Sequence, residues 1–241
     1  MDEHKWNFRG KNVLITGASR GIGKNIALAY GKAGANIILN YRSDDQSAQS
    51  VKEEIESYGG QCTCIKRDVS NIDEIEKLCK EAEEVYSNID IWVNNVGMFK
   101  PALLMRTSEE LFDNYVNTNL KSCFFGMKYA VKSMIQKNVE GRIINIASYS
   151  PYTPAVYESV YGATKAGVIA LTKVAAKEYG FSGIRVNALL PHIVDTDLTR
   201  NALQDSEQII HYSNIANISD MCCFLSSDRA SYITGQPIEV K

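Results

Sequence analysis

The chain has 241 residues, of which 45% are hydrophobic and 22% charged, values typical of globular proteins. Its 26 basic and 28 acidic side chains nearly balance, so no cationic excess is available to bind nucleic acid or an anionic membrane surface. Residues 1–6 lead into no apolar signal segment, and no run approaches the roughly 18 apolar residues of a spanning helix. We therefore expect a cytoplasmic protein that binds neither membranes nor nucleic acid.

The cysteines and histidines show neither a disulfide framework nor metal-ligand spacing. Cys62 and Cys64 lie two residues apart in a predicted strand and so point to one face, whereas Cys222 and Cys223 are adjacent, which is poor geometry for a disulfide. None of the three histidines lies at zinc-ligand spacing from a cysteine pair. We expect reduced thiols and no metal ion.

Short apolar segments alternate with longer amphipathic segments along the whole chain. Continuous apolar runs of this kind are typical of parallel strands covered on both faces. Strands are predicted at residues 13–15, 37–39, 62–65, 89–93, 143–146, 184–190 and 237–240, and helices at residues 23–32, 45–58, 73–86, 108–137, 157–179 and 215–226. The alternation predicts a single-domain α/β fold over residues 1–241, with a Rossmann-type doubly wound parallel sheet of about seven strands and helices on both faces.

In such sheets ligands bind beyond the carboxyl ends of the strands, and the first strand is followed there by a glycine-rich turn. Residues 16–23 read TGASRGIG, with glycines at Gly17, Gly21 and Gly23. Without Cβ atoms these residues allow a tight turn and let a pyrophosphate approach the N-terminus of the next helix, where free N–H groups favour anions. The spacing is G-x-x-x-G-x-G, which differs from the general dinucleotide fingerprint.

Further motifs follow the fourth and fifth strands. Residues 94–97 read NNVG, Tyr161 and Lys165 form a Y-x-x-x-K motif, and Ser148 lies thirteen residues before that tyrosine. Together with the glycine turn, this set resembles the short-chain dehydrogenase/reductase family over residues 11–240. The resemblance implies an oxidoreductase with Ser148, Tyr161 and Lys165 as catalytic residues and Asn119 as a fourth.

The chemistry of these side chains agrees with the implied roles. Tyr161 and Lys165 are four residues apart and lie on one face of the predicted helix. A free tyrosine titrates near pH 10, and we expect the neighbouring ammonium group to lower the pKa of Tyr161, which then gives a proton to a carbonyl oxygen as hydride arrives from a nicotinamide. Ser148 would hydrogen-bond the same oxygen. By resemblance, Lys165 also binds the nicotinamide ribose, and Asn119 anchors a water-linked proton relay.

The resemblance also implies a dinucleotide site along the carboxyl ends of the strands. Its predicted members are Gly17, Ser19, Arg20, Gly21, Ile22, Gly23, Tyr41, Arg42, Asp68, Val69, Asn95, Gly97, Tyr161, Lys165, Pro191, Val194 and Thr196.

The residues after the second strand indicate which nicotinamide cofactor is bound. Tyr41 stands where an acid would bind the ribose hydroxyls of NAD, and Arg42 and Arg20 suit a 2′-phosphate. The alternative is two solvated arginines, and Asp44 and Asp45 complicate the local charge. We expect NADP(H), used for reduction.

Several residues depart from the family pattern. His192 replaces the glycine of a P-G pair and either projects toward the nicotinamide end or points to solvent. Pro151 replaces a glycine near Ser148, while Tyr149, Tyr152 and Tyr157 either line a pocket or pack in the core. The predicted substrate lid, residues 192–214, is short and suggests an open cleft or a bulky substrate. The chain also ends at residue 241 without the D-G-G tail.

The resemblance is closest to reductases that convert a 3-oxoacyl thioester to a 3-hydroxyacyl thioester, with an acyl carrier protein as a candidate partner. Lys128, Lys132 and Lys137 on one predicted helix would form its docking surface, although Ser182 stands where some such reductases have an arginine. The alternative is a reductase of specialised metabolism that acts on a polyketide, sterol, sugar or other small ketone. A third reading is a non-catalytic NADP-binding regulator. Relatives commonly form homodimers or homotetramers through the helices at 108–137 and 157–179.

Overall fold

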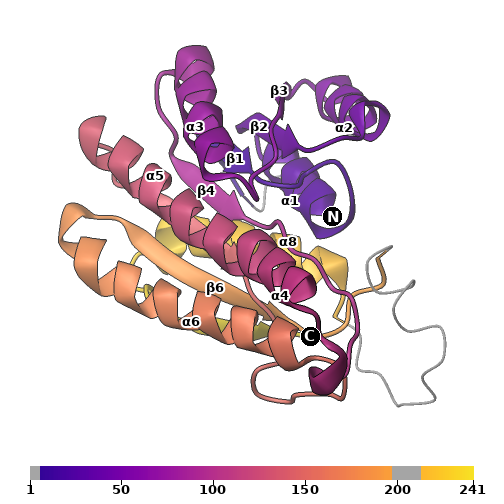
Figure 1. The fold of residues 1–241 in the computed structure, drawn as a ribbon. Coiled ribbons are helices and arrows are strands. Elements are labelled where there is room, and N and C mark those ends of the chain that lie inside the picture. Colours follow the sequence, from indigo (N-terminus) through magenta and orange to yellow (C-terminus); the bar gives the residue numbers. More distant parts are fainter. Residues whose placement is uncertain (1–5, 197–212) are drawn as a thin grey trace.

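A computed structural model describes residues 6–196 and 213–241 (Figure 1). In the described residues seven strands form one parallel sheet in the order β3-β2-β1-β4-β5-β6-β7. The strands are β1 (Asn12–Ile15), β2 (Asn36–Tyr41), β3 (Gln61–Lys66), β4 (Ile91–Asn94), β5 (Arg142–Ile146), β6 (Arg185–Pro191) and β7 (Pro237–Val240). The sheet confirms the predicted Rossmann-type fold, and the strand order reverses direction between β1 and β4, where such folds bind their ligands.

Helices cover both faces of the sheet, because alternate residues of each strand point to opposite sides. Val13 and Ile15 of β1 pack with residues of α1, α2 and α8, whereas Leu14 packs with α3, α5 and α6. Figure 1 shows α5 and α6 side by side in front of the sheet. The helices are α1 (Gly21–Lys32), α2 (Asp45–Ser57), α3 (Ile72–Tyr86), α4 (Glu109–Tyr115), α5 (Ser122–Gln136), α6 (Ser159–Tyr179) and α8 (Ile215–Ser226).

The segment predicted as one helix over residues 108–137 is interrupted. A π-helical stretch, Val116–Lys121, separates α4 from α5 and contains the buried Asn119. The amide of Asn119 donates to the carbonyl of Met98, and its Oδ1 accepts the N–H of the same residue at 2.7 Å. The sequence has an ordinary helical period here and does not reveal the wider turn, because Asn119 makes its contact with a distant segment, the loop after β4.

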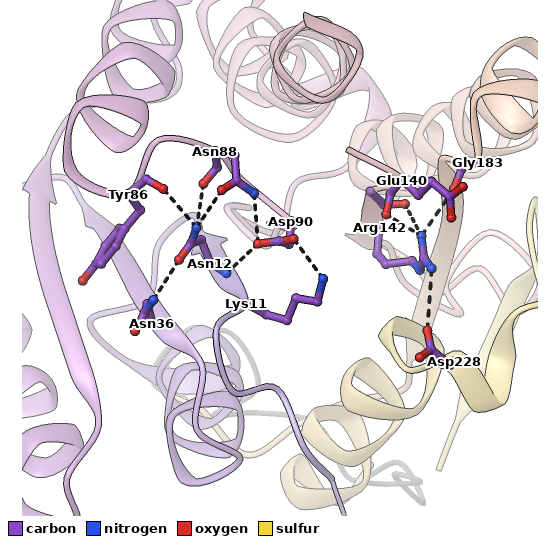
Figure 2. A network of polar contacts seen from close by, with 11 residues as sticks. Lys11, Asn12, Asn36, Tyr86, Asn88, Asp90, Glu140, Arg142, Gly183 and Asp228 are labelled. Atoms are coloured by element: carbon purple, nitrogen blue, oxygen red, sulfur yellow. Dashed lines mark hydrogen bonds and ion pairs between the residues drawn. The ribbon is translucent and has the colours of Figure 1, made fainter. Parts of the chain in front are cut away.

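A polar network holds the amino-terminal edge of the sheet, opposite the glycine turn (Figure 2). Asn12 at the start of β1 donates from its side chain to the carbonyls of Tyr86 and Asn88, and its N–H donates to the Asp90 carboxylate at 2.9 Å. Asn36 of β2 donates to the Asn12 side chain at 2.9 Å. These bonds tie the starts of β1 and β2 to the loop before β4, so the strands keep a fixed register.

The structure also bears on three predictions made from composition. All six cysteines are thiols that form no disulfide, and five of them are buried. Within the described ranges, no helix is both long enough and apolar enough to cross a membrane. No group of three or more His, Cys, Asp and Glu side chains that could hold a metal ion occurs in the same ranges.

Gly23, in the first turn of α1, provides a stability test of the glycine turn. A Cβ atom there would lie 2.4 Å from the Gly17 carbonyl oxygen and 2.6 Å from Nδ2 of Asn95. We expect Gly23→Ala to lower the free energy of unfolding by about 1–3 kcal/mol, as overpacking does. Gly180→Ala is the matched control, since nothing lies within 4 Å of a Cβ there and its φ is −60°. Equal urea midpoints for both variants would contradict this packing.

Candidate active site

The carboxyl end of the sheet brings together the segments that carry the predicted site residues. The glycine turn follows β1, the NNVG segment follows β4, and Ser148 lies two residues after β5. Tyr161 and Lys165 lie on the first two turns of α6. Residues from four separate parts of the chain therefore meet at one edge, on both sides of the split between β1 and β4.

Asn95 fixes the glycine turn through hydrogen bonds. Its Nδ2 donates to the carbonyls of Thr16 at 2.9 Å and of Gly17 at 3.1 Å, and its N–H donates to Oγ1 of Thr16 at 2.9 Å. Gly17 and Gly21 have φ of 63° and 55°, in the left-handed region that favours glycine.

The start of α1 fits the pyrophosphate of a dinucleotide. No side chain caps this helix, and its first turn contains no acidic residue. A Cβ on Gly21 would come no closer than 3.6 Å to any atom, that atom belonging to Thr196. An uncapped helix start of this kind leaves N–H groups that can bind an anion, and no acidic side chain of the first turn competes with it.

A second group of charged side chains lies where β2 and β3 end. The hydroxyl of Tyr41 donates to Oδ1 of Asp45 at 2.8 Å, and Lys66 forms an ion pair with the same carboxylate at 2.7 Å. This hydrogen bond raises the pKa of Tyr41 to about 12, with smaller contributions from burial and the carboxylate charge. Arg20 and Arg42 are exposed, and in the described residues neither forms an ion pair within 4.0 Å.

Tyr161 lies among aromatic rings and beside Ser148. Its ring makes edge contacts with Phe99, at 5.0 Å between centroids, and with Tyr115, at 6.5 Å. Burial raises the pKa of Tyr161 to about 12; a hydrogen bond with the side chain of Ser148 opposes this rise, and the Glu158 charge adds to it. The expectation that Lys165 lowers the pKa of Tyr161 below its usual value is wrong here, because burial disfavours the phenolate more than the neighbouring groups favour it.

Lys165 is itself buried, which the sequence motif does not reveal. Its Nζ donates to the Ile146 carbonyl at 2.9 Å and lies 5.8 Å from the centre of the Tyr161 ring. Burial lowers the pKa of Lys165 to about 8. A Cβ on Gly97 would lie 3.3 Å from this Nζ, so a side chain at this position of the NNVG motif would crowd the ammonium group.

Asn119 lies near Gly97, but its side chain bonds to Met98 and Thr164. Its Oδ1 would be 3.6 Å from a Cβ on Gly97, and its Nδ2 donates to Oγ1 of Thr164 at 3.3 Å. Both ends of the amide are therefore used by protein atoms, which fixes the π-helical stretch against α6. The structure brings the four predicted catalytic residues together, and their roles stay predictions.

The remaining predicted cofactor residues lie at different depths. Val69, Pro191 and Val194 are buried, Val69 and Val194 in the two hydrophobic cores. Asp68 accepts the N–H and the hydroxyl of Ser70. Ser19, Ile22 and Thr196 are partly exposed around the glycine turn. Of the predicted lid, residues 197–212 lie outside the described part of the chain.

His192 is held by contacts with the last strand and with Tyr149. Its Nε2 lies 2.6 Å from Oε1 of Glu239, which also pairs with Lys241, and its ring stacks on Tyr149 at 4.4 Å between centroids. Tyr149 in turn stacks on Tyr152. The imidazole is thus held by the end of β7 beside the residue that follows Ser148.

Sequence reasoning did not identify three residues that the structure places near the site. Lys66 neutralises Asp45, Phe99 contacts the Tyr161 ring, and Glu158 accepts hydrogen bonds in the loop before α6. Only Glu158 had a local signal, as an acid three residues before Tyr161. The other two depend on contacts between distant elements.

Comparison with known proteins agrees with this geometry. The family model described as "Enoyl-(Acyl carrier protein) reductase" matches residues 17–241. A 3-oxoacyl-[acyl-carrier-protein] reductase FabG of Staphylococcus epidermidis is 40% identical over 238 residues, covering 95% of this chain and 97% of the relative. The FabG of Staphylococcus aureus strain Mu50 is 39% identical over 238 residues, covering 95% and 96%. A crystal structure of a short-chain alcohol dehydrogenase from Sinorhizobium meliloti 1021 has a TM-score of 0.91 and 31% identity, covering 97% and 95%.

The fold and the edge of the sheet that carries these side chains define a nucleotide-dependent oxidoreductase. The chain belongs to the short-chain dehydrogenase/reductase family. The predictions of an oxidoreductase that acts on CH–OH and C=O groups, and of NADP(H) as its cofactor, are confirmed by this membership.

The buried ammonium group of Lys165 predicts a pH-dependent stability difference. Between about pH 8 and 10.5 the unfolded chain keeps the Lys165 proton and the folded chain does not, so the free energy of unfolding rises with pH in this window. Relative to Lys165→Met, which lacks the group, the wild type should gain up to about 3 kcal/mol from pH 8 to 10.5. Urea unfolding of both proteins across this range measures the gain.

The control for this experiment is Lys173→Met, which removes an exposed lysine from the same helix. Its stability difference from the wild type should stay constant with pH. A constant difference for Lys165→Met as well would show that Lys165 is not buried as described.

Proposed function

We propose that the protein reduces a 3-oxoacyl thioester to a 3-hydroxyacyl thioester with NADPH. The main support for this reaction is the position of the Tyr161 phenol beside Ser148, with Lys165 on the same face of α6. The choice of substrate is supported by the two staphylococcal relatives, both named 3-oxoacyl-[acyl-carrier-protein] reductases.

In the proposed mechanism, NADPH when bound supplies a hydride to the carbonyl carbon. Ser148 donates a hydrogen bond to the carbonyl oxygen and orients it. Tyr161 gives its phenolic proton to that oxygen, which completes the alcohol. The raised pKa of Tyr161 keeps the proton on the phenol at neutral pH, and Lys165, four residues away, stabilises the phenolate that remains.

We assign the cofactor site to the predicted residues around the glycine turn and the end of β2. The uncapped start of α1 receives the pyrophosphate, and Arg20 and Arg42 receive the 2′-phosphate. Asp45 lies close to this position, but Tyr41 and Lys66 both bind its carboxylate, which reduces its repulsion of an anion. This supports NADP(H) over two merely solvated arginines.

We also assign the helices α4, α5 and α6 to contacts between copies of the chain in a homodimer or homotetramer. Large apolar side chains are exposed on these helices, among them Phe112, Phe124, Ile135 and Val174. A hollow of about 480 Å³ beside the start of α6 is lined mainly by apolar residues. Covering this surface with a second copy would remove it from water.

An acyl carrier protein is the proposed donor of the substrate, and a cytoplasmic location is part of the proposal. The names of the two staphylococcal relatives, both acyl-carrier-protein reductases, support a carrier-borne substrate. The six cysteines, none of which forms a disulfide, support a reducing compartment.

The second candidate is a reductase of a compact ketone from specialised metabolism. Phe99 against Tyr161, together with the stack of His192 and Tyr149, places aromatic rings around the approach to Ser148. Such walls favour a small or flat substrate over a long flexible chain.

The substrate is tested by following NADPH absorbance with the N-acetylcysteamine thioester of 3-oxobutanoate, alongside a panel of cyclic and aromatic ketones. We expect turnover of the thioester, and Tyr161→Phe should reduce it by at least about 100-fold while NADPH binding stays nearly intact. Turnover of a panel ketone alone would favour the second candidate. Full activity of Tyr161→Phe would show that another group supplies the proton.

Cofactor preference is tested at Arg42. Arg42→Ala removes a charge-assisted hydrogen bond to the 2′-phosphate, so the Kd for NADPH should rise by about tenfold or more while that for NADH changes little. Titration of nicotinamide fluorescence measures both. Arg106→Ala, which removes an exposed arginine near η1 (Leu104–Arg106), is the charge-matched control. An equal loss for both cofactors, or for the control, would refute the assignment.

A further inference from the structure

The loop between β5 and α6, residues 147–158, carries a set of hydrogen bonds that meet at one carboxylate. Oε2 of Glu158 accepts the hydroxyl of Ser150 and the N–H of Ala155, the latter at 3.3 Å. Ser150 is near the beginning of the loop and Glu158 is its last residue. The carboxylate therefore closes the loop on itself.

The same bonds reach the hydroxyl of Ser148. The N–H of Ser150 donates to Oγ of Ser148 at 3.1 Å. Because that bond occupies an acceptor position of the oxygen, the hydroxyl proton of Ser148 is left to donate to another group. Glu158 thus lies two hydrogen bonds away from Ser148, with Ser150 as the connecting residue.

Glu158 is also joined directly to the helix that carries Tyr161. It immediately precedes α6, and its carbonyl accepts the N–H of Gly162 at 2.7 Å. The preceding residue, Tyr157, has φ of 72°, a conformation that costs free energy for a non-glycine residue. A constrained backbone at this point fixes where the Glu158 side chain starts.

We propose that Glu158 is a positioning residue, which holds the Ser148 hydroxyl in register with the Tyr161 phenol by clamping the loop through Ser150. The inference rests on the proposed roles of Ser148 and Tyr161. These two side chains come from different elements, separated by a loop that contains Pro151 and Pro154. A carboxylate fixed to α6 and bonded to the Ser148 end of the loop sets the distance between them.

The charge of Glu158 adds a second effect that separates this role from simple loop packing. The groups that face Tyr161 are Ser148 from the end of β5, Tyr115 from α4, and Glu158 and Lys165 from the start of α6. Among them the negative charge of Glu158 raises the pKa of Tyr161 and so favours the protonated phenol. Removing the charge should make the phenolate easier to form.

The test compares Glu158→Gln with Glu158→Ala, using the 3-oxobutanoyl thioester or whichever ketone the wild type reduces fastest. Glutamine keeps an oxygen that accepts both hydrogen bonds but carries no charge, whereas alanine removes both. We expect Glu158→Ala to lower kcat at pH 7 by about tenfold to 100-fold with KM changed less than about twofold, as small misplacements do. Glu158→Gln should restore kcat to within about threefold of the wild type.

The charge effect is measured in the reverse direction, as alcohol oxidation with NADP⁺ across pH 7–10. Oxidation needs the phenolate, whose fraction rises with pH below the pKa of Tyr161. Glu158→Gln should therefore oxidise the alcohol faster at each pH in this range, by about threefold. A residue that only stabilises the loop would not move this profile.

Two further variants keep the test informative. Ser150→Ala removes the connecting hydroxyl but keeps the N–H to Ser148, and it should lower kcat in the same direction by a smaller factor, even if Glu158→Ala fails to fold. Ser159→Ala, at the adjacent exposed position, should match the wild type. Thermal midpoints establish that each variant is folded.

The outcomes separate this inference from the proposed function. If Ser148→Ala and Tyr161→Phe are inactive but Glu158→Ala and Ser150→Ala match the wild type, the clamp is overturned and the function stands. Failure of Glu158→Gln to recover activity over Glu158→Ala, with an unchanged oxidation profile, also overturns it. Full activity of Ser148→Ala and Tyr161→Phe would remove the proposed roles, and the clamp with them.

Discussion

The side chains of Thr16 and Asn95 bind across the split between β1 and β4. Asn95 donates to the carbonyls of Thr16 and Gly17, and the hydroxyl of Thr16 accepts the N–H of Asn95. These bonds hold the glycine turn against the NNVG segment at the place where the strand order reverses. The start of α1 follows this contact on one side, and Gly97, which approaches both Lys165 and Asn119, follows it on the other.

The fold could be predicted because its physical signals are local. Continuous apolar runs mark strands that are buried on both faces, and the last strand and the last helix agree with the prediction at both ends, at Pro237–Val240 and Ile215–Ser226. The π-helical stretch Val116–Lys121 could not be predicted, because nothing in its sequence period differs from a regular helix. Its position depends on the contact of Asn119 with Met98, 21 residues away.

The sequence motifs also indicated which candidate site residues lie together, but their electrostatics was not visible in the sequence. A four-residue spacing places Tyr161 and Lys165 on one helix face, whereas their pKa values depend on how much protein surrounds them. Burial raises the pKa of one and lowers that of the other, so both groups favour their neutral forms. The contact of His192 with Glu239 spans 47 residues and joins a loop to the last strand, so no local pattern could show it.

The strand order has a consequence for how the chain acquires this site. β1 pairs with β2 along one edge and with β4 along the other, and β4 follows only after α2, β3 and α3. Until β4 is made, the apolar edge of β1 has no partner, and such edges invite pairing with other chains. Two parallel strands that are far apart in the sequence pair slowly. A growing or refolding chain therefore passes through a stage in which β1 is exposed and the chain can aggregate. The strand reversal at the candidate site is thus also a point at which folding depends on a distant part of the chain.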